Sequence, residues 1–320
     1  MNSVWGSVAQ YDPVIWNWVI AVYLFLAGLS AGCLLVGITI KWYNGTRGNL
    51  RPDGTIGEPA VLRAAAFLAP ITITLGLACL VLDLTKPLNF WVILVKYNLF
   101  SVMSLGVIAL LVYTPLTYLY AILVLQDEPV PRYPILAKVA DFMEIIRKPF
   151  EVLLFFMAFI IAIYTGFLLS AMNAYPMLNT SILPALFLFS ALSAGAAANN
   201  LCAISMFKAK PHEREISQSH SLEGPVILLE AMFLFMLFIA LYFTGGAAAE
   251  ALASLRDGIW AKVFWIGVVA IGFGIPLVTM ILPKAVQQSK GVAVVAAFAS
   301  LAGVLALRHF ILYAGQSYIS

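Results

Sequence analysis

The sequence predicts an all-α polytopic membrane protein with eight transmembrane helices, and three observations support this fold class. Hydrophobic residues make up 62% of the 320 residues and charged residues only 10%, whereas ordinary soluble domains are about a quarter charged. Eight apolar runs are long enough to cross about 30 Å of hydrocarbon, which needs roughly 20 residues. These runs are continuously apolar and lack the alternation of a membrane β-barrel. The predicted spans are residues 16–42, 61–83, 99–126, 150–172, 181–206, 223–246, 262–283 and 290–313.

The first four spans have recognisable boundaries. No Lys or Arg occurs in the first fifteen residues, so we expect the first run to be a retained span rather than a secretory signal. The second span ends at Asp83, and the third contains Pro115, where we expect a kink. A polar connection at 127–149 precedes the fourth span. The connection at 84–97 is rich in aromatic residues, which predicts an interfacial segment or a docking surface for another subunit.

The last four spans follow the same pattern. The fifth is rich in small residues, and a polar connection at 207–222 separates it from the sixth, which opens with Glu223. The seventh contains Pro276 and is also expected to kink. The eighth contains Arg308. Trp and Tyr gather near the ends of the apolar runs, as expected of the aromatic belts at membrane interfaces.

The basic residues between the spans predict the orientation of the chain. Eight spans place both termini on one side, and the connections on that side carry four basic residues against thirteen on the other. Basic residues concentrate on the cytoplasmic face, so both termini are expected to lie outside, in the periplasm of a bacterial inner membrane. The smaller set is Lys86, Lys96, Arg256 and Lys262; the larger is Lys41, Arg47, Arg51, Arg63, Arg132, Lys138, Arg147, Lys148, Lys208, Lys210, Arg214, Lys284 and Lys290.

A weak internal repeat divides the single predicted membrane domain (1–320). Residues 24–32 (LFLAGLSAG) resemble residues 187–195 (FLFSALSAG), 163 positions later. Both stretches lie in helices that run from outside to inside. Two parallel four-helix halves, 1–172 and 173–320, would produce this pattern. Small residues also recur at helix contacts without any duplication, which is the alternative.

The cysteines and histidines do not predict a metal site. Each of the three cysteines stands alone in an apolar run, whereas zinc and iron–sulfur sites need several ligands close together. Two histidines fall in the polar loop at 207–222 and one near the end of the last span, so no paired imidazoles are expected to hold a haem. The residues are Cys33, Cys79, Cys202, His212, His220 and His309.

Five polar residues from four helices are predicted to share one depth near the outer face. Ionisable side chains within spans are costly and are functional candidates by default. Each also has a structural interpretation: tyrosines can belong to the aromatic belt, a carboxylate at a helix end can be solvated, and an arginine can extend to the surface. The five are Tyr23, Asp83, Tyr164, Arg308 and His309.

A second polar group is predicted nearer the cytoplasm. Glu230 lies roughly 10 Å inside the sixth span by helical rise. Glu223 is seven residues earlier and shares one face of the helix with it. Asn199 and Asn200 lie at similar depth in the preceding helix. Either Glu230 is a neutral carboxyl hydrogen-bonded to an asparagine, or it relays protons from the cytoplasm.

Several stretches spread over nearly the whole chain resemble the NrfD/PsrC family, the quinol-interacting membrane subunits of nitrite, polysulfide and related respiratory reductases. The most specific similarity lies around the fourth and fifth spans. The stretches are 164–171 (YTGFLLSA), 175–179 (YPMLN), 182–184, 186–190, the start with Trp16, Trp18, Ala21, 23–26 and 30–32, and the end with Arg308 and 310–316 (FILYAGQ).

The resemblance is strongest to the polysulfide-reductase branch, and it implies site residues. The essential polar positions of that branch fall on Tyr23, Asp83, Tyr164, Glu230 and Arg308. Glu223 stands where a relative has Asp, and some shorter relatives have His at the Tyr23 position. The family further implies a menaquinol site near the outer face, no haem or iron–sulfur cluster in this chain, and an iron–sulfur partner subunit outside.

These expectations combine into one predicted function. The chain would anchor a respiratory molybdenum/iron–sulfur reductase complex, oxidise menaquinol near the outer face, and pass electrons to an iron–sulfur subunit and a molybdopterin catalytic subunit. Tyr23 and Tyr164 would contact the quinone, with His309 beside them. Asp83 would accept a proton, and Arg308 would stabilise that carboxylate or the developing semiquinone anion. Polysulfide or a related sulfur compound is the expected acceptor, with protons drawn from the cytoplasm through the Glu230 group.

Three alternatives stay open at this point. The complex could serve nitrite, tetrathionate or arsenate instead of a sulfur compound. A proton-coupled secondary transporter could also use buried carboxylates, although broken-helix Gly/Pro pairs do not recur at matching positions in the two halves. A passive anchor would use its polar residues for assembly alone.

Overall fold

The computed structural model describes residues 16–45, 49–50, 56–84, 101–125, 134–211, 213–287 and 289–316. Within these ranges, eight helices are long and apolar enough to cross a membrane, which confirms the predicted fold class. They are α1 (Trp18–Asn44), α2 (Ala60–Leu82), α4 (Val102–Val124), α6 (Arg147–Ser170), α7 (Leu183–Ser205), α8 (Arg214–Thr244), the continuous run α10–η4–α11 (Gly258–Lys262, Val263–Gly274, Ile275–Ile281) and α13 (Lys290–Gln316).

Short elements connect these spans. They are the antiparallel pair β1 (Asn49–Leu50) and β2 (Ile56–Gly57), the helices α5 (Pro134–Ile145), α9 (Gly246–Glu250) and α12 (Lys284–Gln287), and the 3-10 turn η3 (Ala251–Leu255). Within the seventh span, η4 is a π-helical stretch immediately before Pro276. The aromatic connection predicted as a docking segment, 84–97, lies outside the described residues apart from Leu84.

The structure corrects the two predicted polar connections. Helix α5 occupies part of 127–149, and α8 begins at Arg214 rather than near residue 223, so His220 lies in a helix and not in a loop. His212 lies outside the described residues. Polarity suggested a loop at 207–222, but Glu215, Ile216, Ser219 and Glu223 are all buried. Their helical spacing shows that this polar extension packs against the bundle.

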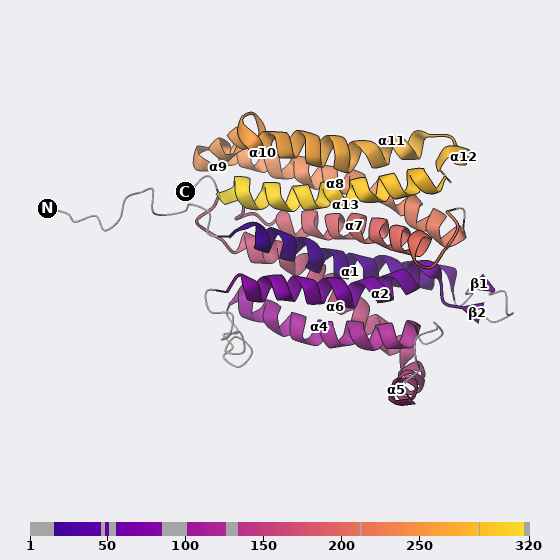
Figure 1. Ribbon diagram of the computed structural model, residues 1–320. Helices are drawn as coiled ribbons and strands as arrows, with labels where there is room; N and C mark the ends of the chain where they lie inside the picture. Colours follow the sequence, from indigo (N-terminus) through magenta and orange to yellow (C-terminus); the bar gives the residue numbers. More distant parts are fainter. Residues whose placement is uncertain are drawn as a thin grey trace.

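Successive spans alternate in direction, and the two ends of the described chain meet at one end of the bundle (Figure 1). The backbone N–H of Trp16 donates to Gln316 Oε1 over 2.9 Å, and Gln316 Nε2 donates to the backbone oxygen of Trp16 over 3.0 Å. We call this end, where α1 begins and α13 ends, the terminal face, and the other end the opposite face. That the terminal face points outward stays a prediction.

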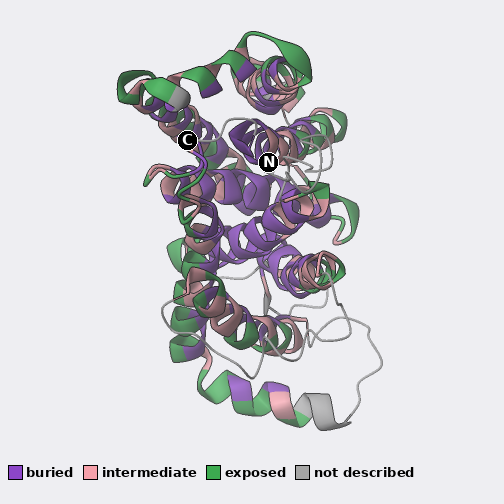
Figure 2. Ribbon diagram, turned by 90° about the vertical axis from the view of Figure 1, so that its left-hand side faces the viewer, coloured by how far each residue is buried: buried purple, intermediate pink, exposed green. Residues whose placement is uncertain are grey.

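Helices α1 and α7 lie in the middle of the bundle (Figure 1) and are the most buried of the spans, and Figure 2 shows that buried residues gather at the centre. A Cβ on Gly32 would collide with the backbone oxygen of Ala191, and one on Gly195 with the backbone of Gly32. The two helices therefore touch backbone to backbone, as small residues permit in membranes. Gly32 and Gly195 are also the equivalent positions of the nine-residue repeat. This contact is compatible with two parallel halves, whose boundary at residue 172 stays a prediction.

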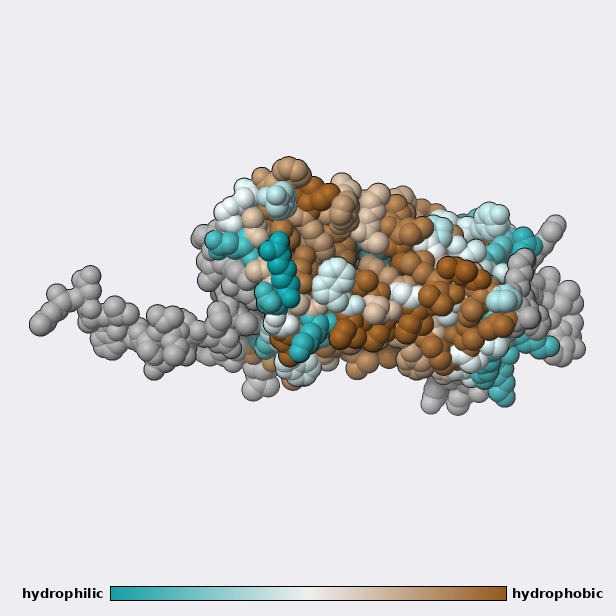
Figure 3. Space-filling model, turned by 90° about the horizontal axis from the view of Figure 1, so that it is seen from above, coloured by the Kyte–Doolittle hydropathy of each residue, from teal (hydrophilic) through white to brown (hydrophobic). Residues whose placement is uncertain are grey.

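The outer helices expose large apolar side chains along the middle of the bundle. Phe235 of α8, Phe156 of α6 and Phe298 of α13 are each more than half exposed. The space-filling view shows a hydrophobic belt between hydrophilic ends (Figure 3). Soluble monomers rarely expose so large an apolar surface, so this belt is the expected lipid-facing surface of a membrane protein.

A buried charge network joins three spans near the opposite face. Glu151 of α6 forms an ion pair with Lys41 of α1, and it also accepts hydrogen bonds from Tyr120 Oη of α4 (3.2 Å) and Arg147 Nε (3.3 Å). Arg147 continues the network to Glu58, which precedes α2. Both Lys41 and Glu151 are buried. Glu151 is therefore the common acceptor on which the packing of α1, α4 and α6 depends.

Replacing Glu151 with glutamine is expected to destabilise the chain strongly. The amide keeps the shape but leaves Lys41 buried without a counter-charge, and removing one partner of a buried pair costs about 3–5 kcal/mol. Unfolding of the detergent-purified chain by heat or denaturant measures the loss. Glu144→Gln is the matched control, because Glu144 also contacts Arg147 but is half exposed. Equal stability of the Glu151 and Glu144 variants would contradict the assigned role.

Candidate functional site

A cavity of about 470 Å³ opens near the terminal face between α1, α2, α4 and α6. Its wall is mostly aliphatic, with a few polar side chains among the apolar ones. This size and composition are typical of a site for a small organic ligand. The polar lining residues are Trp16, Tyr23, Asp83, Thr114 and Tyr164.

Two tyrosines are held in the cavity wall by glycines on the neighbouring helices. Tyr23 of α1 is almost fully buried, and a Cβ on Gly76 of α2 would lie 3.6 Å from its ring. Tyr164 of α6 lies so close to Gly106 of α4 that a Cβ there would overlap its phenol carbon and hydroxyl. Gly106 thus admits the ring of Tyr164 between α4 and α6. The sequence predicted both tyrosines, and the structure brings them to the same cavity.

Asp83 lies at the cavity mouth, where it caps the C-terminal end of α2. Among the described residues, no hydrogen bond or ion pair engages the side chains of Tyr23, Asp83 or Tyr164. Lys86, three residues after Asp83 in the sequence, lies outside the described residues. Two phenols and a carboxylate therefore present unpartnered polar atoms to the cavity.

The structure separates Arg308 from this group. Its Nη2 donates to the backbone oxygen of Phe187 (3.2 Å) and to Ser190 Oγ (2.6 Å), and its guanidinium lies 3.5 Å above the Phe187 ring. Arg308 is fully buried, and the residues lining the cavity do not include it. Arg308 thus does not face the cavity with the other predicted residues, because its helix α13 packs mainly against η4, α7 and α1.

His309 also lies away from the cavity. Its Nδ1 donates to the backbone oxygen of Leu305 over 2.9 Å, one turn earlier in the same helix. Its ring is nearly parallel to that of Tyr313, with centroids 6.4 Å apart. The structure therefore gives His309 local partners in α13 and no position beside Tyr23 and Tyr164.

Arg308 and Glu230 are two buried ionisable residues in the second half of the protein. Glu230 of α8 is 1% exposed. Among the residues that the structure describes, neither of its oxygens has a hydrogen-bond partner, and Nε and Nη1 of Arg308 also lack one. The two side chains interact electrostatically without forming a direct ion pair. Charges at such depth are costly unless paired. The sequence had assigned these residues to separate groups, and in the structure their charges are close enough to influence one another.

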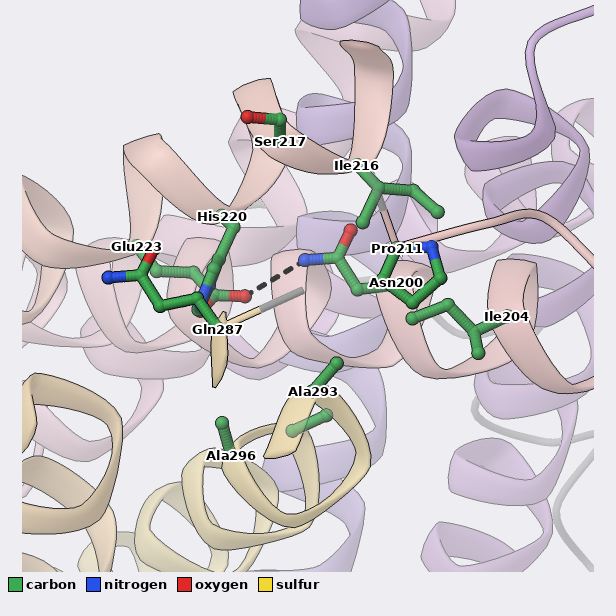
Figure 4. A pocket seen from close by; sticks show the side chains of 11 residues that line it. Asn200, Ile204, Pro211, Ile216, Ser217, His220, Glu223, Gln287, Ala293 and Ala296 are labelled. Carbon is green, nitrogen blue, oxygen red and sulfur yellow. Dashed lines mark hydrogen bonds and ion pairs between the residues drawn. The ribbon is translucent and has the colours of Figure 1, made fainter. Parts of the chain in front are cut away.

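A smaller polar cavity of about 180 Å³ lies near the opposite face, between α7, α8, α12 and α13 (Figure 4). Glu223 accepts a hydrogen bond from Asn200 Nδ2 (3.0 Å) and pairs with His220 Nδ1 (2.7 Å). Asn199 instead donates to the backbone oxygen of Cys33 in α1 (2.9 Å). The asparagine that was expected to bond to Glu230 thus bonds to Glu223 instead, and Asn199 binds the central helix; within the described part of the chain, Glu230 has no asparagine partner. His220 was missed because its segment was taken for a loop.

The first cavity has the chemistry to bind a flat, apolar molecule with oxygen atoms at its ends. Phenol hydroxyls can donate or accept hydrogen bonds, and an ionised carboxylate accepts them. Among the described residues, no group of three or more His, Cys, Asp or Glu side chains is arranged to hold a metal ion. A hydroxylated aromatic ring is therefore the best-fitting ligand class.

Comparison with known proteins gives consistent similarities. The family described as "Polysulphide reductase, NrfD" matches residues 6–320. The sequence is 44% identical to the C subunit of polysulfide reductase from Wolinella succinogenes over 323 residues, covering 100% of both proteins. It is 37% identical to protein NrfD of Escherichia coli over 320 residues, covering 97% of this protein and 98% of the relative. A protein NrfD homolog of Haemophilus influenzae is 34% identical over 95% of each protein.

Proposed function

Because this chain belongs to the NrfD family, we propose that it is the membrane anchor of a respiratory reductase complex and that it oxidises menaquinol in the cavity at the terminal face. The polar group at that cavity carries the proposal: Tyr23, Asp83 and Tyr164 present unpartnered atoms in an otherwise apolar site. Menaquinol is a flat, apolar ring with two hydroxyl groups. The aliphatic wall suits the apolar ring, and the polar side chains can form hydrogen bonds with the hydroxyl groups.

Each residue of the group has a distinct role. Tyr23 and Tyr164 hydrogen-bond the oxygen of the quinol nearer the terminal face, and their rings are held in place by Gly76 and Gly106. Asp83, at the mouth, accepts a proton as the quinol is oxidised. A base positioned in this way typically increases the rate of the chemical step by about 10²- to 10⁴-fold. Arg308 lies outside the cavity, so we now assign it with Glu230 to proton movement deeper in the bundle.

The sides of the membrane follow from the distribution of basic residues. Thirteen lie on the side away from the termini and four on the terminal side, which makes the terminal face periplasmic. An iron–sulfur subunit and a molybdopterin catalytic subunit then dock on the terminal face and receive the electrons. Since a 44% identical relative is named as the C subunit of polysulfide reductase, polysulfide or a related sulfur compound is the proposed acceptor. Nitrite, tetrathionate and arsenate are the alternatives.

Menaquinol oxidation by the reconstituted complex tests this function. The purified complex is placed in proteoliposomes with menaquinol, and reduction of the sulfur acceptor is measured with and without this subunit. The proposal expects acceptor reduction only when the subunit is present. Equal rates without it would show that quinol oxidation takes place in another subunit.

Quinol oxidation releases its two protons at the terminal face, and we propose that the protons consumed when the acceptor is reduced enter from the opposite face through Glu223, Asn200, Glu230 and Arg308. Glu223 and Asn200 line the polar cavity there, and Glu230 follows two turns deeper on the same helix. Asn199, at the same depth, fixes the neighbouring backbone of α1. This route would make the complex electrogenic, because protons would cross most of the membrane.

Replacing Glu230 with glutamine is expected to abolish this proton uptake. In proteoliposomes with the opposite face inward, the wild-type complex should make the interior alkaline during quinol oxidation, and Glu230→Gln should reduce that signal by at least about tenfold, because the amide cannot relay a proton. An internal pH probe gives the measurement. Glu250→Gln is the control, since Glu250 is exposed near the terminal face. Quinol oxidation by the wild type without alkalinisation would contradict the route while leaving the quinol site intact.

A further inference from the structure

The proline in the middle of α4 leaves a backbone oxygen in the cavity wall without its usual helical donor. Pro115 has no N–H, and its ring displaces the carbonyl four residues earlier, which is that of Leu111. Leu111, Thr114 and Pro115 all line the cavity near the terminal face. Pro115 therefore leaves a backbone hydrogen-bond acceptor, the Leu111 carbonyl, at a residue of a mostly aliphatic wall.

Thr114 adds a donor at the same place. Its hydroxyl is buried and has no hydrogen-bond partner among the described residues. Threonine hydroxyls in helices ordinarily bond to a carbonyl three or four residues earlier, and those of Thr72, Thr117 and Thr165 do so. The hydroxyl of Thr114 is the exception among these four, and Thr114 is one of the residues that line the cavity.

The spacing along α4 matches the length of a quinol ring. Tyr164 lies against Gly106, eight residues before Thr114. Eight residues of helix span about 12 Å along the axis. If a ligand oxygen forms a hydrogen bond of about 2.8 Å at each end of this span, the two ligand oxygens are roughly 6 Å apart. The para oxygens of a six-membered ring are separated by about this distance. One ring can therefore reach Tyr164 with one oxygen and Thr114 with the other.

We propose that Thr114 and the Leu111 carbonyl position the inner hydroxyl of the quinol, the one farther from the terminal face. This inference rests on the proposed quinol site. The Thr114 hydroxyl donates to the quinol oxygen, while the quinol hydroxyl donates to the Leu111 carbonyl. After oxidation the quinone oxygen can only accept, so the bond to Thr114 persists and the bond to Leu111 is lost. The Leu111 carbonyl thus favours the reduced substrate over the oxidised product.

Two variants of α4 separate these two roles. Thr114→Val removes the hydroxyl at nearly constant volume. It is expected to raise the KM for a short-chain naphthoquinol roughly three- to tenfold, because losing one hydrogen bond weakens binding by about that factor. The kcat should change little. Pro115→Ala supplies an N–H to the Leu111 carbonyl. It is expected to raise the KM for the quinol while leaving inhibition by the corresponding naphthoquinone unchanged.

The controls make each outcome decisive. Thr114→Ser should restore the wild-type KM, and Thr72→Val, whose hydroxyl bonds within α2, should leave it unchanged. Size-exclusion chromatography of each complex confirms assembly. An active wild type with an unchanged KM in Thr114→Val overturns the role of Thr114, as does a serine variant as impaired as the valine variant. Equal changes in quinol KM and quinone inhibition in Pro115→Ala overturn the selectivity of Leu111. A wild-type complex that does not oxidise quinol at all overturns the proposed function itself.

Discussion

Asp83→Asn is expected to lower the rate of menaquinol oxidation by about 10²- to 10⁴-fold while the complex still assembles. The amide has the shape of the carboxylate but cannot take a proton from the quinol. Asp83 lies at the end of α2, at the cavity mouth, and has no partner within the described part of the chain. Its replacement therefore breaks no hydrogen bond or ion pair within the described residues, and the loss should fall on kcat.

Stopped-flow oxidation of menaquinol by the reconstituted complex measures this loss. Asp141→Asn is the matched control, because Asp141 is exposed on α5, far from the cavity lining. Assembly is followed by co-purification of the partner subunits. An assembled Asp83→Asn complex with wild-type activity would contradict the proposed base and favour a passive anchor.

Gly195→Leu is expected to prevent accumulation of the folded protein. The crossing of α1 and α7 brings the backbone at Gly195 against that of Gly32, so even a methyl group has no space there. Overpacking a core typically costs 1–3 kcal/mol and more where the obstacle is backbone. Because α1 and α7 form the centre of the bundle, moving them apart would also disrupt their packing against most of the other spans.

The amount of protein in purified membranes and its melting temperature in detergent measure this effect. Gly291→Leu is the control, since a side chain at that position of α13 meets nothing within 4 Å. Accumulation of the Gly195 variant at the level of the Gly291 variant would show that the two central helices are not packed this closely.

The sequence predicted much of the fold because hydrocarbon allows few alternatives. Run length alone located eight spans, and the small residues of the repeat marked the helices that meet at the centre. Tyr23, Asp83 and Tyr164 were also identified, because polar groups in a span stand out against apolar neighbours and their depth follows from helical rise. Other residues could be placed only from the structure, because their role depends on which helix they face.

Depth along a helix says nothing about which neighbour a side chain faces. Arg308 and Tyr23 lie at similar depths, but Arg308 points to α7 and Glu230 rather than to the cavity. His220 was missed because its polar segment continues α8 instead of forming a loop. Thr114 carries no charge and has no distinctive spacing. The kink predicted at Pro115 was the one signal that could have directed attention to it.

The position of Arg308 has a consequence for how the protein enters the membrane. Insertion measurements on isolated helices give a cost of about 2.5–3.5 kcal/mol for an arginine at the helix centre. The hydrogen-bond acceptors of Arg308 belong to α7 and its counter-charge to α8, and both helices leave the ribosome before α13. The last helix therefore recovers the cost of its arginine only when α7 is already in place beside it. A chain misassembled at α7 would leave the guanidinium without its acceptors inside the bilayer.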